Sequence, residues 1–158
     1  MKTADLMDDF QDELESCEIQ FKSFGRLKQF HGPCRTIKCK EDNALLRKTL
    51  EEEGQGQVLV VDGEGSLYSA LLGDMIADIA YKNGWAGVLI YGAIRDSLAI
   101  NEIEIGVKAL GTNPRKSKKE GLGAIDEPLS FGGVSISPGD WLYSDEDGIV
   151  IAKRQLPA

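Results

Sequence analysis

Residues 57–62 read Gln57-Val58-Leu59-Val60-Val61-Asp62, and residues 86–91 read Ala86-Gly87-Val88-Leu89-Ile90-Tyr91. Each segment is an almost continuous apolar run, which is typical of a strand that is buried on both faces of a sheet. The residues between the two runs include an apolar set at helical spacing from 74 to 83, and Gly84 is suited to end that helix. A strand, a helix and a second buried strand in this order predict a parallel β-α-β crossover and an α/β fold.

The N-terminal side of this unit predicts a first amphipathic helix. Leu6, Phe10 and Leu14 recur every four residues behind Thr3, which is suited to be an N-cap. We therefore expect a short helix over residues 3–14.

Asp42 or Asn43 is suited to cap a second helix, which is expected to run through Leu45, Leu46 and Leu50. Gly54 is expected to end it in the left-handed conformation that glycine adopts without strain. Before this helix, residues 36–39 are predicted to form a strand.

The C-terminal side predicts a short helix after Asp96, a strand over 106–110, and a lysine-rich loop over 113–123 that faces solvent. Residues 132–151 alternate short apolar runs with tight turns and are expected to be mainly β, with Asp145, Asp147 and Gly148 in a turn. The sequence contains no internal repeat and no linker. We therefore expect residues 1–158 to form one domain of mixed sheets with packed helices.

The charge of the chain restricts its partners. It has 26 acidic and 18 basic residues and a formal net charge of −8, which repels nucleic-acid backbones and attracts basic proteins. No apolar run approaches the roughly 20 residues needed to span a bilayer, and the first ten residues are acidic where a signal peptide would be basic. The expectation is a cytoplasmic protein with no direct nucleic-acid partner and no membrane contact.

Three cysteines, an odd number, argue for reduced thiols rather than a disulfide framework. His31, Cys34 and Cys39 resemble part of a zinc cluster, but a fourth ligand at suitable spacing is missing. Zinc binding is therefore the weaker interpretation of these residues.

The two buried strands end in Gly63-Glu64-Gly65 and in Gly92-Ala93-Ile94-Arg95-Asp96, and ligands of α/β proteins favour such carboxyl ends. Asp74 could simply cap the following helix, or the free N–H groups of that first turn could bind an anion. Arg95 and Asp96 could form a surface pair, or could stabilise an enolate and hold a divalent cation. The spacing alone leaves these alternatives open.

One pattern favours the chemical interpretation: Asp74 is followed, after twenty residues, by Arg95-Asp96. This pattern resembles the class II pyruvate aldolases of the regulator of ribonuclease activity A family. The resemblance extends through Thr3-Ala4-Asp5-Leu6, Val60-Val61-Asp62-Gly63, Gly73-Asp74, Tyr91-Gly92-Ala93-Ile94-Arg95-Asp96, Phe131-Gly132-Gly133-Val134 and Pro138-Gly139-Asp140.

The resemblance implies a swivelling β/β/α domain, similar to phosphohistidine domains, that assembles as a homotrimer or a dimer of trimers. It also implies a metal-dependent lyase that cleaves 4-hydroxy-4-methyl-2-oxoglutarate to pyruvate and decarboxylates oxaloacetate, through a pyruvate enolate common to both reactions.

The roles implied by the resemblance can be assigned to residues of this chain. Asp96 would ligate Mg²⁺ or Mn²⁺, Arg95 would contact the substrate and stabilise the enolate, and Asp74 would hold a metal-bound water. Backbone amides of Leu71-Leu72-Gly73-Asp74 and of Met75 would bind the substrate carboxylate. Glu64 is a weaker candidate for the same pocket.

A regulator that binds and inhibits ribonuclease E is the alternative function implied by the same resemblance. The net charge of −8 suits a basic partner segment. Because Asp74, Arg95 and Asp96 are all present, the sequence favours the lyase.

Overall fold

Four parallel strands form the centre of the computed structural model, which describes residues 1–157. They are β3 (Phe30–Lys38), β4 (Val58–Asp62), β6 (Gly87–Ile94) and β7 (Gly106–Thr112), adjacent in that order. Short β5 (Ala70–Leu72) pairs with β6, β2 (Lys22–Phe24) closes the edge at β7, and β8 (Ala124–Ile125) pairs with β3. The predicted parallel crossover from β4 to β6 is confirmed.

A second, antiparallel group of strands lies on the other side of β3. It consists of β11 (Trp141–Asp145), β12 (Gly148–Ala152) and β1 (Leu14–Ser16), while β9 (Leu129–Phe131) and β10 (Val134–Ile136) form a separate hairpin. The long strand β3 joins the two groups, because residues 30–33 pair with β11 and residues 34–38 pair with β4.

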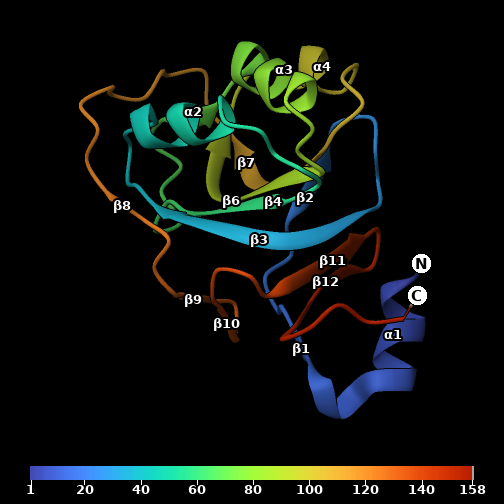
Figure 1. The fold of residues 1–158 in the computed structure, drawn as a ribbon. Coiled ribbons are helices and arrows are strands. Elements are labelled where there is room, and N and C mark those ends of the chain that lie inside the picture. The colour runs from blue at the N-terminus through green and yellow to red at the C-terminus, as the bar shows by residue number, and fades with distance from the viewer. Residues whose placement is uncertain (158) are drawn as a thin grey trace.

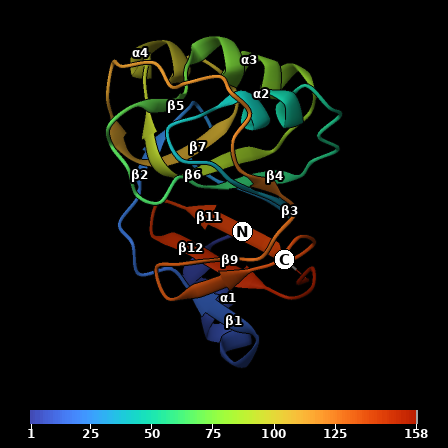
Figure 2. The ribbon, with the colours of Figure 1, turned by 90° about the vertical axis from the view of Figure 1, so that its left-hand side faces the viewer.

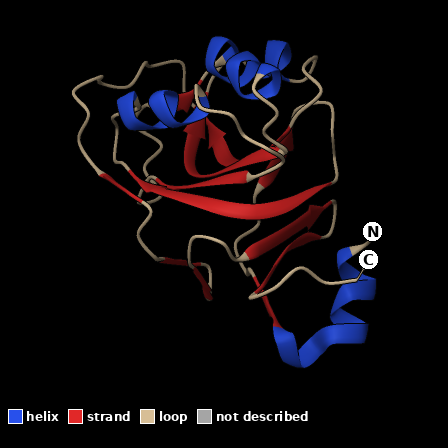
Figure 3. Ribbon diagram, viewed as in Figure 1, coloured by secondary structure: helices blue, strands red, loops and turns tan. Residues whose placement is uncertain are grey.

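The helices complete the layers (Figures 1 and 3). Helices α2 (Ala44–Leu50), α3 (Asp74–Lys82) and α4 (Ser97–Ile100) cover one face of the parallel strands, and the β11–β12 hairpin lies under the other face. Helix α1 (Thr3–Phe10), followed by a 3-10 turn over Gln11–Glu13, lies at the far end beside both termini. The same layers appear from the side in Figure 2. The expected α/β class with mixed sheets and packed helices is confirmed.

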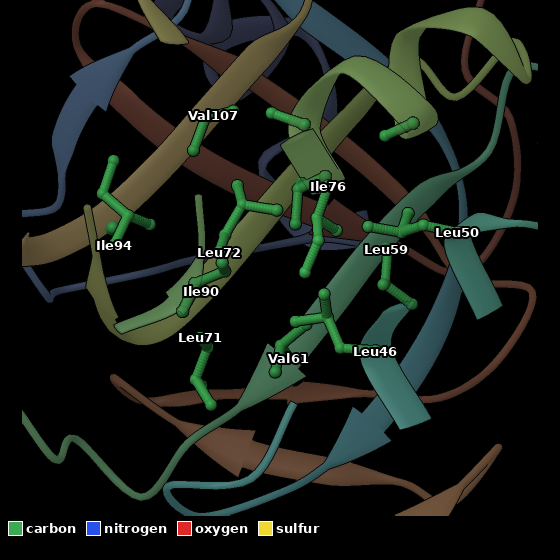
Figure 4. Packing of buried hydrophobic residues seen from close by; sticks show 14 of the residues in the cluster. Leu46, Leu50, Leu59, Val61, Leu71, Leu72, Ile76, Ile90, Ile94 and Val107 are labelled. Carbon is green, nitrogen blue, oxygen red and sulfur yellow. The ribbon is translucent and has the colours of Figure 1, made fainter. Parts of the chain in front are cut away.

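The apolar run of β4 is buried on both faces. Leu59 and Val61 point toward the helices and pack with Leu46 and Leu50 of α2, as Figure 4 shows. Val58 and Val60 point the other way, into the hydrophobic cluster between the two groups of strands. This two-sided burial explains why the strand reads as a continuous apolar run rather than an alternating one.

Phe30 fixes how closely the two groups of strands approach. Its ring lies over the glycines of two neighbouring strands, because a Cβ at Gly87 would be 2.3 Å from Phe30 Cδ2 and one at Gly106 would be 2.0 Å from Phe30 Cδ1. These glycines are therefore required by packing, not by backbone conformation.

The predicted first helix begins at Thr3 as expected, but its end and its cap were wrong. Helix α1 ends at Phe10, and Leu14 is buried in β1. The N-cap position is Lys2 rather than Thr3, and no side chain of its own element caps it. Asp145, more than 100 residues away, accepts hydrogen bonds from Thr3 N and Thr3 Oγ1, both at 2.7 Å. A long-range contact replaces the expected local cap.

The end of the second predicted helix was also wrong. Helix α2 has Glu51 as its C-cap, and the positive φ angles occur at Gln55 and Gly56. Gly54 is required instead by a close approach, since a Cβ there would lie 2.6 Å from Trp85 N and Cγ. The predicted strand 36–39 overlaps the end of the longer β3, which begins at Phe30 and ends at Lys38, so Cys39 lies outside it.

The turn predicted at Asp145, Asp147 and Gly148 joins β11 to β12 and is confirmed. Within the described residues, no helix is both long and apolar enough to cross a membrane.

Candidate active site

The pairing of β5 with β6 brings the two sequence motifs together. Both strands run in the same direction, so Gly73-Asp74 after β5 and Arg95-Asp96 after β6 emerge at the same edge of the sheet. Arg95 N donates to Leu72 O at 2.9 Å, and Asp74 N donates to Asp96 Oδ2 at 3.2 Å. Residues that are 22 positions apart in sequence therefore share one hydrogen-bonded corner.

Asp96 has an unusual backbone at this corner. Its φ and ψ of 57° and 41° lie in the left-handed region, at the N-cap position of α4. Aspartate tolerates this region better than most residues, although strain of about 1 kcal/mol or more is typical there. The conformation directs the carboxylate back to α3, so Asp96 caps the helix that begins at Asp74 rather than its own helix.

Gly73 allows the close contact between Asp96 and α3. It occupies the N-cap position of α3, and a Cβ there would lie 2.8 Å from Asp96 Oδ2 and 3.5 Å from Arg95 Nε. The φ of −120° is accessible to any residue, so space rather than conformation requires glycine here.

Arg95 extends across the rim of the site. Its Nη1 donates to Pro114 O at 3.4 Å, and its Nε lies 3.9 Å from Asp96 Oδ2. Both side chains are 41% exposed, so the pair contributes little to stability. The guanidinium therefore keeps donors available for a bound anion.

A cleft of about 90 Å³ lies in front of these residues and is lined by Gly73, Asp74, Met75, Arg95 and Asp96. A shallower hollow of about 270 Å³ adjoins it on the other side of Arg95 and Asp96, beside Thr112 and Pro114. The predicted catalytic and metal-binding residues thus border one cleft.

A second part of the cleft lining was missed by the sequence analysis. It comprises Asn43 and Arg47 of the α2 segment together with Lys116, Ser117 and Lys119. The lysine-rich loop was expected only to face solvent, yet it contributes to the cleft. A signal was present, because this loop follows β7, the next parallel strand, and parallel strands end at a common edge.

The other predicted residues lie around the cleft or away from it. The side chains of Leu71 and Leu72 are buried in the core beneath the helices, so only their backbone could meet a ligand. The first-turn N–H groups of α3, including that of Met75, lack intrahelical acceptors and are the better anion donors. Glu64 lies in the exposed turn after β4, with φ of 58°, outside the cleft lining in the described residues.

The zinc interpretation of the early residues does not fit the fold. Cys34 packs between the two sheets, Cys39 packs beneath the helices, and His31 stacks on Tyr143 with ring centroids 5.8 Å apart. Burial raises the pKa of each of these two thiols to about 12, which opposes the thiolate form that zinc binds.

The acidic residues of the cleft could hold a hard cation. No group of three or more histidine, cysteine or acidic side chains arranged for a metal occurs in residues 1–157. Mg²⁺ commonly takes only one or two carboxylates and completes its shell with water and substrate oxygens. Asp96, exposed beside Asp74, supplies that oxygen-only donor set, so the residues present fit Mg²⁺ or Mn²⁺ and not zinc.

The comparisons with known proteins cover nearly the whole chain. A family model described as RraA-like, Aldolase/RraA, matches residues 3–151. A protein of Alkalilimnicola ehrlichii, provisionally named as a 4-hydroxy-4-methyl-2-oxoglutarate aldolase, is 53% identical over 154 residues, which cover 98% of this chain and 96% of that protein.

Two solved structures are similar over the full length. One from Geobacillus kaustophilus, described as an S-adenosylmethionine:2-dimethylmenaquinone methyltransferase, is 54% identical with a TM-score of 0.97, covering 99% of this chain and 97% of that chain. The RNA-processing inhibitor RraA from Thermus thermophilus is 48% identical with a TM-score of 0.96, covering 100% and 96%. Because the three relatives carry three different functional names, the residues of the cleft must decide between activities.

Proposed function

This chain belongs to the RraA-like family, Aldolase/RraA, and we propose that it is a divalent-cation-dependent lyase acting on 2-oxo acids. The proposed reactions are cleavage of 4-hydroxy-4-methyl-2-oxoglutarate to pyruvate and decarboxylation of oxaloacetate. The relative named as an aldolase supports a lyase in general. The observation that carries the specific proposal is that Asp74, Arg95 and Asp96 border one cleft, joined by the 3.2 Å bond from Asp74 N to Asp96 Oδ2.

The carboxylate next to the 2-oxo group would bind at the start of α3. The free N–H groups of that first turn point out of the helix, and the helix dipole typically adds about 0.3–1 kcal/mol to anion binding. Met75 lies at this position and lines the cleft. This contact orients the substrate and leaves its 2-oxo oxygen toward Arg95 and Asp96.

Arg95 would stabilise the negative charge that develops on the 2-oxo oxygen when the bond between C3 and C4 breaks. A guanidinium offers several fixed donors, and one well-placed donor to a developing oxyanion is typically worth about 3 kcal/mol. A cation held by Asp96, with Asp74 orienting a water, would supply Lewis-acid polarisation of the same oxygen. In this arrangement no lysine needs to form a Schiff base.

The test is pyruvate formation from 4-hydroxy-4-methyl-2-oxoglutarate and from oxaloacetate with Mg²⁺ or Mn²⁺, compared with a metal-only blank and with a chelator. We expect turnover well above the blank, loss of turnover with the chelator, and a fall of about 100-fold or more in Arg95→Ala. Arg26→Ala is the matched control, because Arg26 pairs with the surface carboxylates of Glu102 and Glu104 and with no other acid of residues 1–157. Equal rates in the two variants would contradict the assignment.

We also propose a homotrimer or a dimer of trimers. Large apolar side chains are exposed, including Met75 of the cleft lining at 69%, Tyr68 at 58% and Leu98 at 83%. An exposed apolar group of this kind is typical of a subunit interface. Light scattering on the purified chain tests the proposal, and a monomer at micromolar concentration would contradict it.

A ribonuclease regulator is the second candidate function. It is favoured by the 48% identity to a protein described as an RNA-processing inhibitor and by the net charge of −8. Titrating the chain into a ribonuclease E cleavage assay tests this role, with Arg95→Ala as the comparison. Inhibition that persists in Arg95→Ala would show a function separate from the cleft, and no inhibition would remove this candidate.

A further inference from the structure

Asp42 is a buried carboxylate that the proposed chemistry does not use. It is 1% exposed and accepts four backbone N–H groups: Ala44 N at 3.1 Å, Glu120 N at 2.9 Å, Gly121 N at 3.2 Å and Leu122 N at 3.3 Å. Burial by itself would raise its pKa, but these four bonds hold the pKa below the ordinary value, so the group stays anionic.

These bonds join two segments that are far apart in sequence. Ala44 is the first residue of α2, whereas Glu120, Gly121 and Leu122 belong to the lysine-rich loop. The adjacent backbone strengthens the connection, because Asn43 N donates to Lys118 O at 3.0 Å and Lys118 N donates to Glu41 O at 2.9 Å. The loop is therefore held against the beginning of α2.

The joined segments form one wall of the cleft, with Arg47 on α2 and Lys116 and Lys119 on the loop. Neither lysine forms an ion pair within residues 1–157, and Arg47 has only an exposed contact of 3.6 Å with Glu51. With Arg95, the lining of the cleft has four basic residues and two acidic ones, Asp74 and Asp96. This excess of positive charge is unusual in a chain with a net charge of −8.

We infer that Asp42 is a positioning residue that fixes Arg47, Lys116 and Lys119 as a subsite for a second carboxylate, so that the cleft selects 2-oxo dicarboxylates over 2-oxo monocarboxylates. The inference rests on the proposed function, in which the first carboxylate binds at α3. In this arrangement the first carboxylate of the substrate lies at α3 and the second lies at the basic subsite. The 2-oxo group lies between them.

A purely structural role for Asp42 predicts a different result. If Asp42 only caps α2, its replacement lowers stability and all activities together. If it positions the basic wall, its replacement affects dicarboxylates selectively. Pyruvate is the discriminating ligand, because exchange of its methyl protons with solvent needs the α3 side of the cleft but no second carboxylate.

The first experiment uses Asp42→Asn, which keeps the size of the side chain and turns one acceptor oxygen into a donor facing the loop amides. We expect faster amide hydrogen exchange in segment 116–123. We also expect the KM for oxaloacetate to rise about tenfold or more, which corresponds to the free energy of losing one hydrogen bond to a charged group. Pyruvate methyl exchange at saturating pyruvate should stay within about twofold of wild type. A matched loss of both activities, or unchanged loop exchange, would overturn the inference.

Asp140→Asn is the matched control. Asp140 is also a buried carboxylate, 6% exposed, which accepts Ser137 N at 2.8 Å and pairs with Lys153 Nζ at 2.7 Å, away from the cleft. The Asp140→Asn variant should be less stable than wild type but should have an unchanged KM for oxaloacetate. A rise in KM equal to that of Asp42→Asn would show that any lost buried carboxylate produces the effect and would overturn the inference.

The double variant Lys116→Gln, Lys119→Gln tests the subsite even if Asp42→Asn does not fold. Both side chains are exposed, so the loop anchor remains intact. We expect the same selective rise in KM for oxaloacetate with normal loop exchange. An unchanged KM would show that the basic wall does not bind substrate.

A titration with malonate separates this inference from the proposed function, since malonate carries two carboxylates but cannot react. Amide NMR shifts at both Met75 and Lys119 in a wild-type protein that lacks turnover would support the subsite and refute the lyase. If malonate shifts neither the Met75 amide nor the Lys119 amide, the subsite is refuted, whether or not the protein shows turnover. Acetate, the matched monocarboxylate, should leave Lys119 unshifted.

Discussion

At the scale of single residues, the site depends on how closely Asp96 approaches the backbone of α3. Its left-handed conformation and the missing side chain of Gly73 together allow the carboxylate to reach Asp74 N. An ordinary N-cap side chain could cap α3 without a left-handed backbone, so capping alone does not require this arrangement. Backbone strain at such a position is typical of a functional site.

Gly73→Ala should therefore impair activity more than stability. The new Cβ would lie 2.8 Å from Asp96 Oδ2 and would displace the carboxylate, and a misplacement of about 1 Å can cost about 100-fold in rate. The measurements are the rate of pyruvate formation and the free energy of unfolding, which should fall by less than about 1 kcal/mol.

Gly111→Ala serves as the control for Gly73→Ala, since a Cβ there meets only Leu67 Cδ2, at 4.0 Å. It should retain activity. If Gly73→Ala were as active as this control, the position of Asp96 would not matter for the reaction.

At the scale of elements, Phe30 and the glycines of β6 and β7 determine how closely the two groups of strands pack. Gly106→Ala should destabilise the protein by about 1–3 kcal/mol, the usual cost of overpacking, because the new Cβ would overlap the ring of Phe30. Urea unfolding measures the loss.

The double variant Phe30→Leu, Gly106→Ala should be less destabilised than the two single changes add up to, because the smaller side chain makes room for the methyl group. Strict additivity of the two losses would show that Phe30 and Gly106 are not coupled and would contradict this account of the packing.

Helix α1 is attached to the hairpin β11–β12 through Asp145. Burial alone would raise the pKa of this carboxyl, but hydrogen bonds from Thr3 N, Thr3 Oγ1 and the amides of Asp147 and Gly148 hold it below the ordinary value. A group with a lowered folded-state pKa stabilises the protein above its unfolded pKa, near 4, and this stability is lost as the pH falls through the folded pKa.

Wild type should consequently lose stability on acidification below about pH 4, and Asp145→Asn should show a shallower loss from a lower starting value. Denaturant unfolding between pH 7 and pH 2.5 measures both curves. Asp8→Asn, on the exposed face of α1, is the control and should follow wild type. Parallel curves for Asp145→Asn and wild type would contradict the role of Asp145.

At the scale of the whole molecule, the two buried thiols lie in separate layers of the core. Cys34 lies between the sheets and Cys39 lies beneath the helices, whereas Cys17 is only half-buried. Burial raises the pKa of Cys17 as well, but its exposure leaves it the most reactive of the three.

We propose that residues 1–158 unfold as one domain, and the thiols test this proposal. In the native protein at pH 8 a thiol reagent should modify Cys17 first, and Cys34 and Cys39 should become reactive together across one urea transition. Modification of Cys39 at lower urea than Cys34 would show that the two core layers unfold separately.

By itself, the sequence determined the α/β class, the crossover from β4 to β6 and helix α3, because each depends on local periodicity and on glycines that end a helix. It also placed Asp96 after a buried strand and Asp74 at the start of a helix, both of which are positions where ligands bind. These features are confirmed in the fold, while their catalytic roles remain proposals.

Only the tertiary structure decided the remainder. The cap of α1 by Asp145, the contact of Phe30 with two glycines and the anchoring of the lysine-rich loop by Asp42 all join residues that are far apart in sequence. Local patterns contain no information on such partners, because each contact forms only when the strands have been ordered in the sheet. The basic wall of the cleft is therefore a property of the fold, although every charge in it is visible in the sequence.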